Sequence, residues 1–346
     1  MRKLSIFNKA IFFLNIIFAL VTIISLVIPF VPVTSMPTLS AISIVVPFLV
    51  LINVAFVLYW ILGRKKRFLA LSGILLLLWY IFLGPFYEFS SKEGGQPKDA
   101  RSLSIMSFNA RSFNEMKQLK VDNVDSLIYN FVSTQDPDIV CFQETLYAMK
   151  RNNALSQYKY KFVDFIYGKR RGKVILSVYS KFPIIKVESI DFPKSANNAI
   201  YADVLFAGDT IRVYNIHLQS FRITPELSIK QEESSKLFAR VKKVMLKQYE
   251  QANLIRENMK KNPYRKIVVG DFNNTQYSNV YQTIKGEMTD SYLEKGAGFG
   301  RTYDLLGFPL RIDYILADPE FEVLSHQNFD DKLSDHYPIM ATLRLP

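Results

Sequence analysis

The sequence has very little cysteine, and one long N-terminal stretch has no charge at all. A single cysteine, Cys141, excludes an internal disulfide framework, and its place in the apolar run DIVCFQE predicts a core residue. Between Lys9 and Arg64 no charged residue occurs, and that gap holds two long apolar runs. The chain also lacks internal repeats and low-complexity tracts, which excludes a repeat array.

Three apolar segments predict transmembrane helices. Residues 10–33 and 41–62 lie in the uncharged stretch, and residues 68–86 follow the basic cluster GRKKR. Each is near the ~20 residues that a helix needs to cross a bilayer. The first segment could instead be a cleavable signal peptide, but its length, its lack of a small-residue cleavage site and the succession of three segments argue against that. We therefore predict a membrane domain over residues 1–87, with the lipid bilayer as its partner.

The positive charge is concentrated near the N-terminus. The chain has a net charge of +12, and seven basic residues but no acidic ones lie within residues 1–67. This charge is therefore mainly a topology signal rather than a nucleic-acid footprint. Short basic loops stay in the cytoplasm, so the N-terminus and residues 64–67 are predicted to lie inside. We therefore predict an integral protein of the cell (inner) membrane. Three spans then place the chain after residue 86 on the non-cytoplasmic side.

The remainder of the chain reads as a linker and an α/β domain. Residues 88–102 are polar, with Gly-Gly and Pro, and predict a linker. In residues 103–346 strand-like runs outnumber helical patterns, and short turns such as FAGDT join some of them. This pattern favours a four-layer α-β-β-α sandwich of two mixed sheets over a doubly wound parallel sheet. Helices are predicted over residues 122–133 and about 228–261. Strands are predicted in LSIMSFNA, DIVCFQ, YKFVDFI, KVILSVYS, AIYADVLFA, TIRVYNIHL, KIVVGDF, RIDYILA and PIMATLRL.

Several of these apolar runs end in polar residues. In KIVVGDFNN, for example, three β-branched residues are followed by Asp271 and Asn273. Polar residues at converging strand ends are how α/β scaffolds assemble sites from distant sequence. Carboxylate and amide oxygens suit Mg²⁺, and histidine transfers protons near neutral pH. The inventory matches metal-assisted phosphate-ester hydrolysis. Other polar residues lie in or beside such runs: LSIMSFN ends in Asn109, DIVCFQE ends in Gln143 and Glu144, RVYNIHLQS carries His217, RIDYIL embeds Asp313, and Asp335 and His336 stand just before the last strand.

The motifs SFN, QE, NIHL, GDFN, RIDYIL and SDHYPI occur in one order along the chain. In that order they resemble the endonuclease/exonuclease/phosphatase superfamily, which includes deoxyribonuclease I-like nucleases, inositol-polyphosphate 5-phosphatases and neutral sphingomyelinases. The resemblance covers roughly residues 103–346 and implies a phosphoesterase that depends on Mg²⁺ (or Mn²⁺). One departure is Arg111, which stands where abasic-site nucleases have an aspartate. It argues against the DNA-repair branch and a second acidic metal ligand.

The resemblance also implies residue roles. Glu144 is the principal metal ligand, Asn109 supports the metal and the phosphate, and Asp335 lies near the metal. Catalysis is assigned by the same resemblance to the polar residues of the later motifs. Asp271 orients or deprotonates the attacking water, Asn273 holds a phosphoryl oxygen, His336 contacts the phosphate or exchanges a proton with its ring held by Asp313, and His217 is the second histidine.

Other readings of single residues stay open. Asp313 could pair with Arg311, and His217 could be a core histidine. His326 has no motif around it and is predicted to lie at the surface. The segment GKRRGK, residues 168–173, is predicted to be a solvated basic loop. Thr302 and Tyr303 could line the substrate cleft or serve packing.

The function predicted is hydrolysis of phosphodiester bonds by a membrane-anchored enzyme, either nuclease-like or sphingomyelinase/phospholipase-like. One alternative is a phosphomonoesterase of the inositol-polyphosphate phosphatase kind. Another is an inactive domain that serves as a membrane-tethered binding module. The partner expected besides the bilayer is a phosphate-ester substrate, in nucleic acid or in a phospholipid headgroup. No protein partner can be inferred from the sequence.

Overall fold

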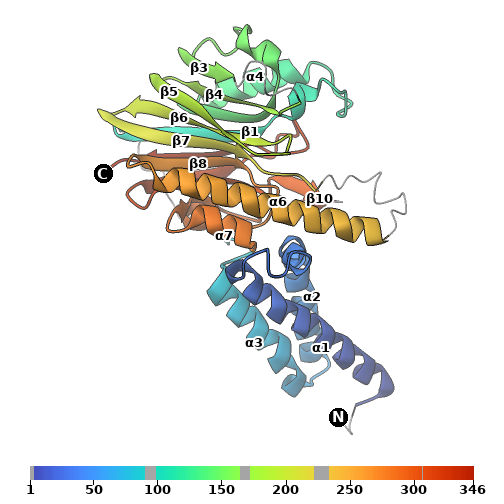
Figure 1. Ribbon diagram of the computed structural model, residues 1–346. Helices are drawn as coiled ribbons and strands as arrows, with labels where there is room; N and C mark the ends of the chain where they lie inside the picture. Colours follow the sequence, from blue (N-terminus) through green and yellow to red (C-terminus); the bar gives the residue numbers. More distant parts are fainter. Residues whose placement is uncertain (1–3, 90–98, 164–171, 222–233, 306) are drawn as a thin grey trace. The chain divides into compact units, whose positions relative to one another are not determined.

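The computed structural model describes residues 4–89, 99–163, 172–221, 234–305 and 307–346 (Figure 1). The chain divides into two compact units. Unit 1 comprises Met1–Phe86, Glu233–Tyr249 and Asn274–Gln282. Unit 2 comprises Tyr87–Glu232, Glu250–Asn273 and Thr283–Pro346.

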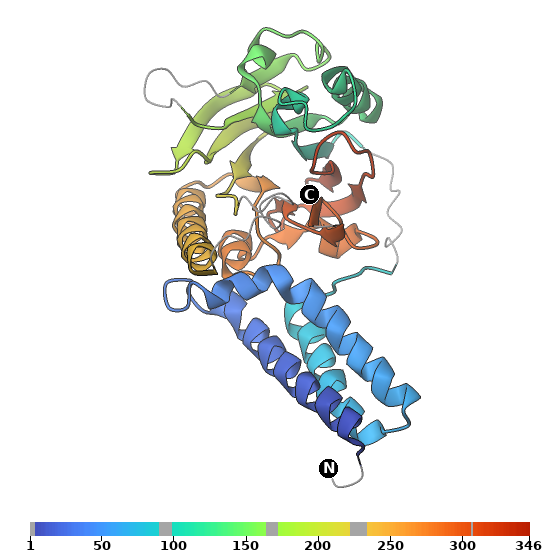
Figure 2. The same ribbon diagram turned by 90° about the vertical axis from the view of Figure 1, so that its right-hand side faces the viewer.

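Three long helices form most of unit 1: α1 (Ile6–Val27), α2 (Ile42–Leu62) and α3 (Lys66–Leu83). They pack side by side (Figure 2). Short 3₁₀ turns, η1 (Ile28–Phe30) and η2 (Leu39–Ala41), extend two of them. By length and composition all three helices could cross a membrane, over Ile6–Phe30, Leu39–Leu62 and Lys66–Leu83. The three apolar helices expected from the sequence are therefore present.

A buried polar network joins the three helices. Asn15 of α1 donates to Ser72 of α3 at 2.7 Å, and Ser72 donates to Asn53 of α2 at 2.8 Å. The Asn53 amide in turn donates to Thr22 of α1 at 2.9 Å, and the Trp60 indole donates to Asn15 at 3.1 Å. All five side chains are buried. Because an apolar solvent cannot satisfy these groups, the network favours one arrangement of the helices.

The segment Asn274–Gln282 belongs to unit 1 and is held by its helices. Ser43 of α2 donates to the Asn274 side chain at 2.9 Å, and Thr275 donates back to the Ser43 carbonyl at 2.6 Å. Tyr277 packs on Trp79 of α3, with ring centroids 5.5 Å apart. Asn274 is therefore a buried contact residue.

Unit 2 contains two six-stranded mixed sheets. The first has the order β13-β14-β1-β2-β4-β3, with β1 and β2 parallel and the other neighbours antiparallel. The second has the order β5-β6-β7-β8-β12-β9, with β7 and β8 parallel and the other neighbours antiparallel. The strands of the first sheet are β1 (Ser102–Asn109), β2 (Ile139–Thr145), β3 (Tyr160–Val163), β4 (Ile175–Ser180), β13 (Glu322–Asn328) and β14 (Ile339–Arg344). Those of the second are β5 (Ile184–Asp191), β6 (Asn198–Phe206), β7 (Asp209–His217), β8 (Arg265–Asp271), β9 (Thr289–Asp290) and β12 (Asp313–Ala317).

The remaining elements are one small hairpin and several helices. The hairpin is β10 (Tyr303–Leu305) with β11 (Phe308–Leu310). The helices are α4 (Val124–Gln135), α6 (Ser234–Lys260), α7 (Asn279–Lys285), α8 (Ser291–Lys295), η3 (Arg111–Asn114) and η4 (Tyr147–Lys150). Helices α6 and α7 each have residues in both units.

Two large apolar cores lie between layers of unit 2. One lies between the sheets and includes Ile105, Cys141, Val213 and Val269. The other lies between the first sheet and α4, which covers that sheet in Figure 1. The fold is the predicted α-β-β-α sandwich of two mixed sheets. Most of the segment GKRRGK falls outside the described residues.

Candidate active site

The space between the two sheets is apolar along most of its length and polar at one end. Alternate residues of a strand share a face, so Leu103 and Ile105 of β1 point between the sheets, and Asn109 follows on the same face. On β8, Ile267 and Val269 are followed in the same way by Asp271. The polar ends of these apolar strands therefore meet at the edge of the inter-sheet core.

Strand register brings the polar residues of the second sheet into one row. The parallel pair β7–β8 places His217 beside Asp271. The antiparallel pair β8–β12 places Asp313 on the other side of Asp271. Gly270 makes this close pairing possible, because a Cβ atom there would lie 2.0 Å from the Ile216 carbonyl oxygen.

Asp271 is held by amides from both sheets. Its Oδ2 accepts from Asn109 Nδ2 at 3.0 Å and from Asn273 Nδ2 at 3.1 Å, and its Oδ1 accepts from the Asn273 backbone N–H at 2.7 Å. Asn109 Nδ2 also donates to Glu144 Oε1 at 3.3 Å. Asn109 therefore links Asp271 of the second sheet to Glu144 of the first.

His217 lies buried between these two carboxylates. Its Nε2 is 3.5 Å from Asp271 Oδ2 and 3.7 Å from Glu144 Oε1. Within the described part of the chain neither ring nitrogen has a hydrogen-bond partner. Burial lowers the pKa of His217, which favours the neutral ring. The His217 ring is buried, has unused hydrogen-bonding capacity and faces two carboxylates. These properties are more typical of a ring that binds a ligand than of a core histidine.

His336 is paired with Asp313. Its Nδ1 lies 2.9 Å from Asp313 Oδ2, and its Nε2 lies 3.7 Å from Asp271 Oδ2. Burial opposes the charge of this ring, but the carboxylates of Asp313 and Asp271 outweigh burial and raise the pKa of His336 well above its ordinary value. Burial also raises the pKa of Asp271; the His336 charge partly offsets this, and the Asp313 charge adds to it. Arg311, the alternative partner of Asp313, is bound instead to Asp290 at 2.8 Å.

Left-handed backbone occurs at several positions around the site. Glu144 has φ 48° and Asn273 has φ 49°, and the four residues Arg111–Asn114 have φ between 41° and 61°. Non-glycine residues pay about 1–2 kcal/mol for this conformation, and such strain tends to gather at functional sites. The strained positions here include two of the residues that the motifs singled out.

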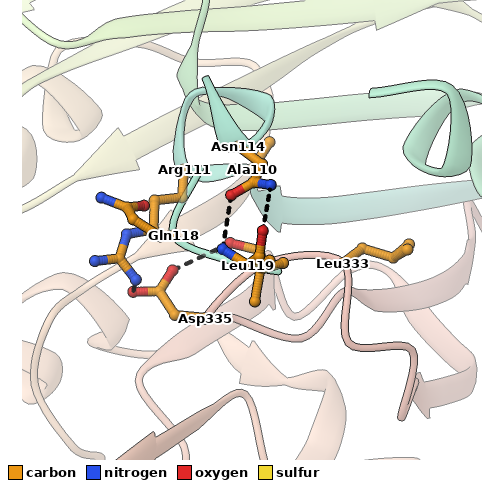
Figure 3. Close-up of a pocket in the computed structure, with 8 residues that line it drawn as sticks. Ala110, Arg111, Asn114, Gln118, Leu119, Leu333 and Asp335 are labelled. Carbon is orange, nitrogen blue, oxygen red and sulfur yellow. Dashed lines mark hydrogen bonds and ion pairs between the residues drawn. The ribbon is translucent and has the colours of Figure 1, made fainter. Parts of the chain in front are cut away.

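Asp335 contacts Arg111 in the structure. The Arg111 guanidinium lies 2.7 Å from Asp335 Oδ2, beside a pocket that Asn114, Leu119 and Leu333 also line (Figure 3). Asn114 exchanges two hydrogen bonds with the Leu119 backbone and so closes the loop that carries Arg111. Within the part of the chain that the structure describes, Asp271, Asp313 and His336 form a buried cluster that could hold a metal ion, with ligand atoms within 4.8 Å of one another.

Three further residues differ from their sequence interpretation or refine it. His326 is partly buried rather than a surface residue, because its Nδ1 lies 2.8 Å from Ser291 Oγ; burial lowers its pKa to about 4. Thr302 Oγ1 accepts from the Asp313 backbone N–H at 3.1 Å and so supports that residue. The Tyr303 ring packs against His336, with centroids 5.0 Å apart.

One pair of site neighbours, Gln143 and Asn215, received no specific role from the sequence. Both amides are fully buried between the sheets and hydrogen-bonded to each other at 2.7 Å. An amide two residues before His217 in the apolar run RVYNIHL was a signal that could have marked Asn215.

Residues 106–336 match the model of the Endonuclease/Exonuclease/phosphatase family. The chain belongs to this family. Endonuclease/exonuclease/phosphatase proteins are enzymes that hydrolyse phosphate esters, and the chain is such a hydrolase. Residues 8–86 match a domain of unknown function, DUF8431. No curated protein matches the chain.

Solved structures of the family share the fold at low sequence identity. A Bacteroides thetaiotaomicron endonuclease/exonuclease/phosphatase family protein is 20% identical, with a TM-score of 0.54 over 71% of this chain and 98% of that one. D. rerio TDP2 complexed with single strand DNA product is 18% identical, with a TM-score of 0.51 over 70% and 99% of the two chains. Mannosyl-6-phosphatase Bt3783 of Bacteroides thetaiotaomicron VPI-5482 is 20% identical, with a TM-score of 0.50 over 70% and 99%.

Proposed function

We propose that this family member is a membrane-anchored, divalent-metal-dependent phosphodiesterase. The observation that carries the proposal is the position of His217. Its ring faces Glu144 of the first sheet and Asp271 of the second at 3.7 and 3.5 Å. A candidate metal ligand, a candidate base and a buried imidazole thus surround one point, as phosphoryl transfer requires.

The side chains around Glu144 fit a hard divalent cation. The Glu144 side chain is one-third exposed, and Asn109 Nδ2 donates to it. The Asn109 oxygen accepts from the Arg111 backbone N–H at 3.1 Å, so it would have to exchange that partner to bind an ion. Carboxylate and amide oxygens are the ligands that Mg²⁺ and Mn²⁺ prefer, and such ions keep several waters. Glu144 and Asn109 would hold the ion, with Asp335 beside them. When bound, it would stabilise the negative charge that develops on the phosphate.

Asp271 is proposed as the base that orients or deprotonates the attacking water. Its raised pKa makes its carboxylate a stronger proton acceptor than an exposed aspartate. Asn273 keeps the carboxylate in place through its side-chain and backbone N–H groups. In the structure the Asn273 amide also donates to the Leu218 carbonyl, so its proposed contact with a phosphoryl oxygen requires it to exchange that partner.

His336 is proposed as the proton donor to the leaving group. Asp313 holds its Nδ1, so its Nε2 is left to face Asp271 and the substrate. The raised pKa of His336 favours the protonated ring, which can donate a proton. His217, with its lower pKa, is proposed to hydrogen-bond a phosphoryl oxygen through its neutral ring.

We place phosphodiesters ahead of phosphomonoesters as substrates. The fold alone does not decide, since similar structures include TDP2 with a DNA product and a mannosyl-6-phosphatase. A terminal phosphate carries an extra negative charge and calls for free cationic side chains. Arg111, which lines the pocket beside the site, is already paired with Asp335. The diester proposed is one in nucleic acid or in a phospholipid headgroup.

The three apolar helices are proposed to anchor the enzyme in the cell membrane. The charge asymmetry of residues 1–67 supports a catalytic domain on the non-cytoplasmic side. The linker predicted over residues 88–102 is short, so it would hold the site near the bilayer. That proximity favours lipid headgroups slightly over free polymers.

A direct test uses the full-length chain in detergent with bis(p-nitrophenyl) phosphate and p-nitrophenyl phosphate, each with Mg²⁺ and with EDTA. We expect turnover of the diester that EDTA abolishes, and slower turnover of the monoester. Glu144→Gln keeps the shape but removes the charge, so it should lower the rate by at least ~10²-fold. Glu257→Gln, on the exposed side of α6, is the control and should be unaffected. Parental activity in Glu144→Gln with Mg²⁺ present would show that the assigned site is wrong.

A further inference from the structure

A bulge in β2 sets the direction of Glu144. From Phe142 to Thr145 β2 advances three residues, while β4 advances only two, from Ser177 to Ile175. One residue of β2 is therefore extra, and Glu144 within this bulge has φ 48°. Bulges of this kind bend a strand and re-aim a side chain, and they are frequent beside active sites.

Without the bulge Glu144 would face the wrong core. Val140 and Phe142 point away from the second sheet, into the core beneath α4. Strict alternation along β2 would send Glu144 to that same side. In the structure Glu144 instead reaches Asn109 and His217 at the inter-sheet edge. The site thus depends on one irregular stretch of four residues.

Asn215 of the opposite sheet binds this irregular stretch. Its Nδ2 donates to the carbonyl oxygens of Phe142 at 2.9 Å and Ser177 at 3.0 Å, the last pair in register before the bulge. Its Oδ1 accepts from Gln143 Nε2 at 2.7 Å, and Gln143 directly precedes Glu144. One side chain from β7 therefore satisfies three groups of β2 and β4.

These contacts are made where water does not compete. Asn215, Gln143 and Ser177 are fully buried. A buried carbonyl or amide left without a partner destabilises the folded state, so the three groups favour the backbone conformation that keeps Asn215 bound. On the far side, the Ala110 N–H donates to the Gln143 carbonyl at 3.0 Å. The backbone at Gln143 is thereby fixed from two directions.

We propose that Asn215 is a positioning residue that holds the β2 bulge, and through it Glu144, from the opposite sheet. Asn215 acts through Glu144 and touches neither substrate nor metal. The inference rests on the proposed function in one respect, which is the role of Glu144 as a metal ligand. Its consequence is that a buried amide of the second sheet helps to set the position of Glu144 in the first sheet.

The test compares Asn215→Ala with Val213→Ala in the full-length chain. Val213 is fully buried on the same face of β7 and packs in the apolar core between the sheets, so both variants truncate a buried side chain of one strand. Mn²⁺ affinity without substrate is measured from the EPR signal of the free ion, alongside melting temperature, kcat and KM. Both variants should melt earlier than the parent. Asn215→Ala alone should bind Mn²⁺ ~10–100-fold more weakly and lose kcat, as loss of a residue that orients a ligand does.

Asn215→Asp provides a second variant if the alanine variant does not fold. It fills the same space and keeps an acceptor for Gln143, but it loses the amide donors to the two carbonyls. Its added negative charge by itself would favour cation binding, so weaker Mn²⁺ binding in this variant supports the positioning role.

Each outcome is decisive. Parental Mn²⁺ affinity in folded Asn215→Ala or Asn215→Asp would overturn the inference, as would an equal loss in Val213→Ala, which would indicate a general loss of stability. Either result leaves the proposed function intact when the parent binds Mn²⁺ and turns over the diester. A parent that neither binds Mn²⁺ nor shows turnover would overturn the proposed function and this inference together.

Discussion

At the scale of single residues, the charge of Asp313 controls the proton on His336. Asp313→Asn removes the carboxylate that raises the pKa of His336, so that pKa should fall. Because a proton donor loses activity as pH rises through its pKa, the alkaline limb of the pH–rate profile should move to lower pH. Asp304→Asn is the control, since Asp304 binds Tyr337 instead of His336. An alkaline limb at the parental position in Asp313→Asn would contradict the assignment of His336 as the acid.

The same pair links stability to pH. The charged His336 ring stabilises the folded state fully below its unfolded pKa of about 6.5. That contribution is lost as pH rises through the raised folded-state pKa. The pH window in which this stabilisation is lost therefore lies above about pH 6.5. Asp313→Asn should narrow that window, because it lowers the folded-state pKa of His336.

Gly270 has no room for a side chain. A Cβ atom there would overlap the Ile216 carbonyl oxygen at 2.0 Å, and the backbone has φ 136°. Gly270→Ala should therefore destabilise the protein by more than about 3 kcal/mol, measured by chemical unfolding in detergent. Gly73→Ala, in helix α3 with no atom within 4 Å of the added methyl group, should be neutral or slightly stabilising. Similar stability of the two variants would show that β7 and β8 can separate at Gly270 without loss.

At the scale of elements, the association of the three helices depends on their polar network. Asn53→Ala removes the contacts of α2 with Ser72 and Thr22 and should destabilise the helix bundle by about 1 kcal/mol. Leu58→Ala, on the half-exposed side of the same helix, provides the control. Thermal unfolding in detergent micelles measures both. An equal effect of the two substitutions would mean that apolar packing, rather than the buried amide, holds the helices.

The elements also show how far sequence patterns reach. Strands with long apolar runs, such as β8, were predictable because burial on both faces leaves a continuous signal. The edge strand β5 was missed, since its exposed Lys186 and Glu188 interrupt the apolar pattern. The motif residues of both sheets were predicted as a set, because each lies at the end of an apolar run, within one or just before one. Their register, the pairing of Asp335 with Arg111 and the bulge at Glu144 were not predictable, since these depend on residues far apart in the chain.

At the scale of the whole molecule, the topology remains a prediction with a direct test. Basic residues near the N-terminus and at residues 64–67 should lie in the cytoplasm, with the chain after three spans outside. An alkaline-phosphatase fusion after Pro346 should be active, and a green-fluorescent fusion there should be dark. Fusions after Lys65, between α2 and α3, should give the reverse and serve as the internal control. A fluorescent fusion after Pro346 would put the catalytic domain in the cytoplasm and make intracellular nucleic acid the first candidate substrate.

The grouping of Asn274–Gln282 with the N-terminal helices decides how the chain can be dissected. A fragment that begins at residue 103 would retain every family motif but lose Ser43 and Trp79, the cover of Asn274, Thr275 and Tyr277. That uncovered segment follows directly on the GDFN motif. Weak activity or aggregation of such a fragment would therefore report the missing cover and say little about the chemistry, and enzymology on this protein needs the intact chain.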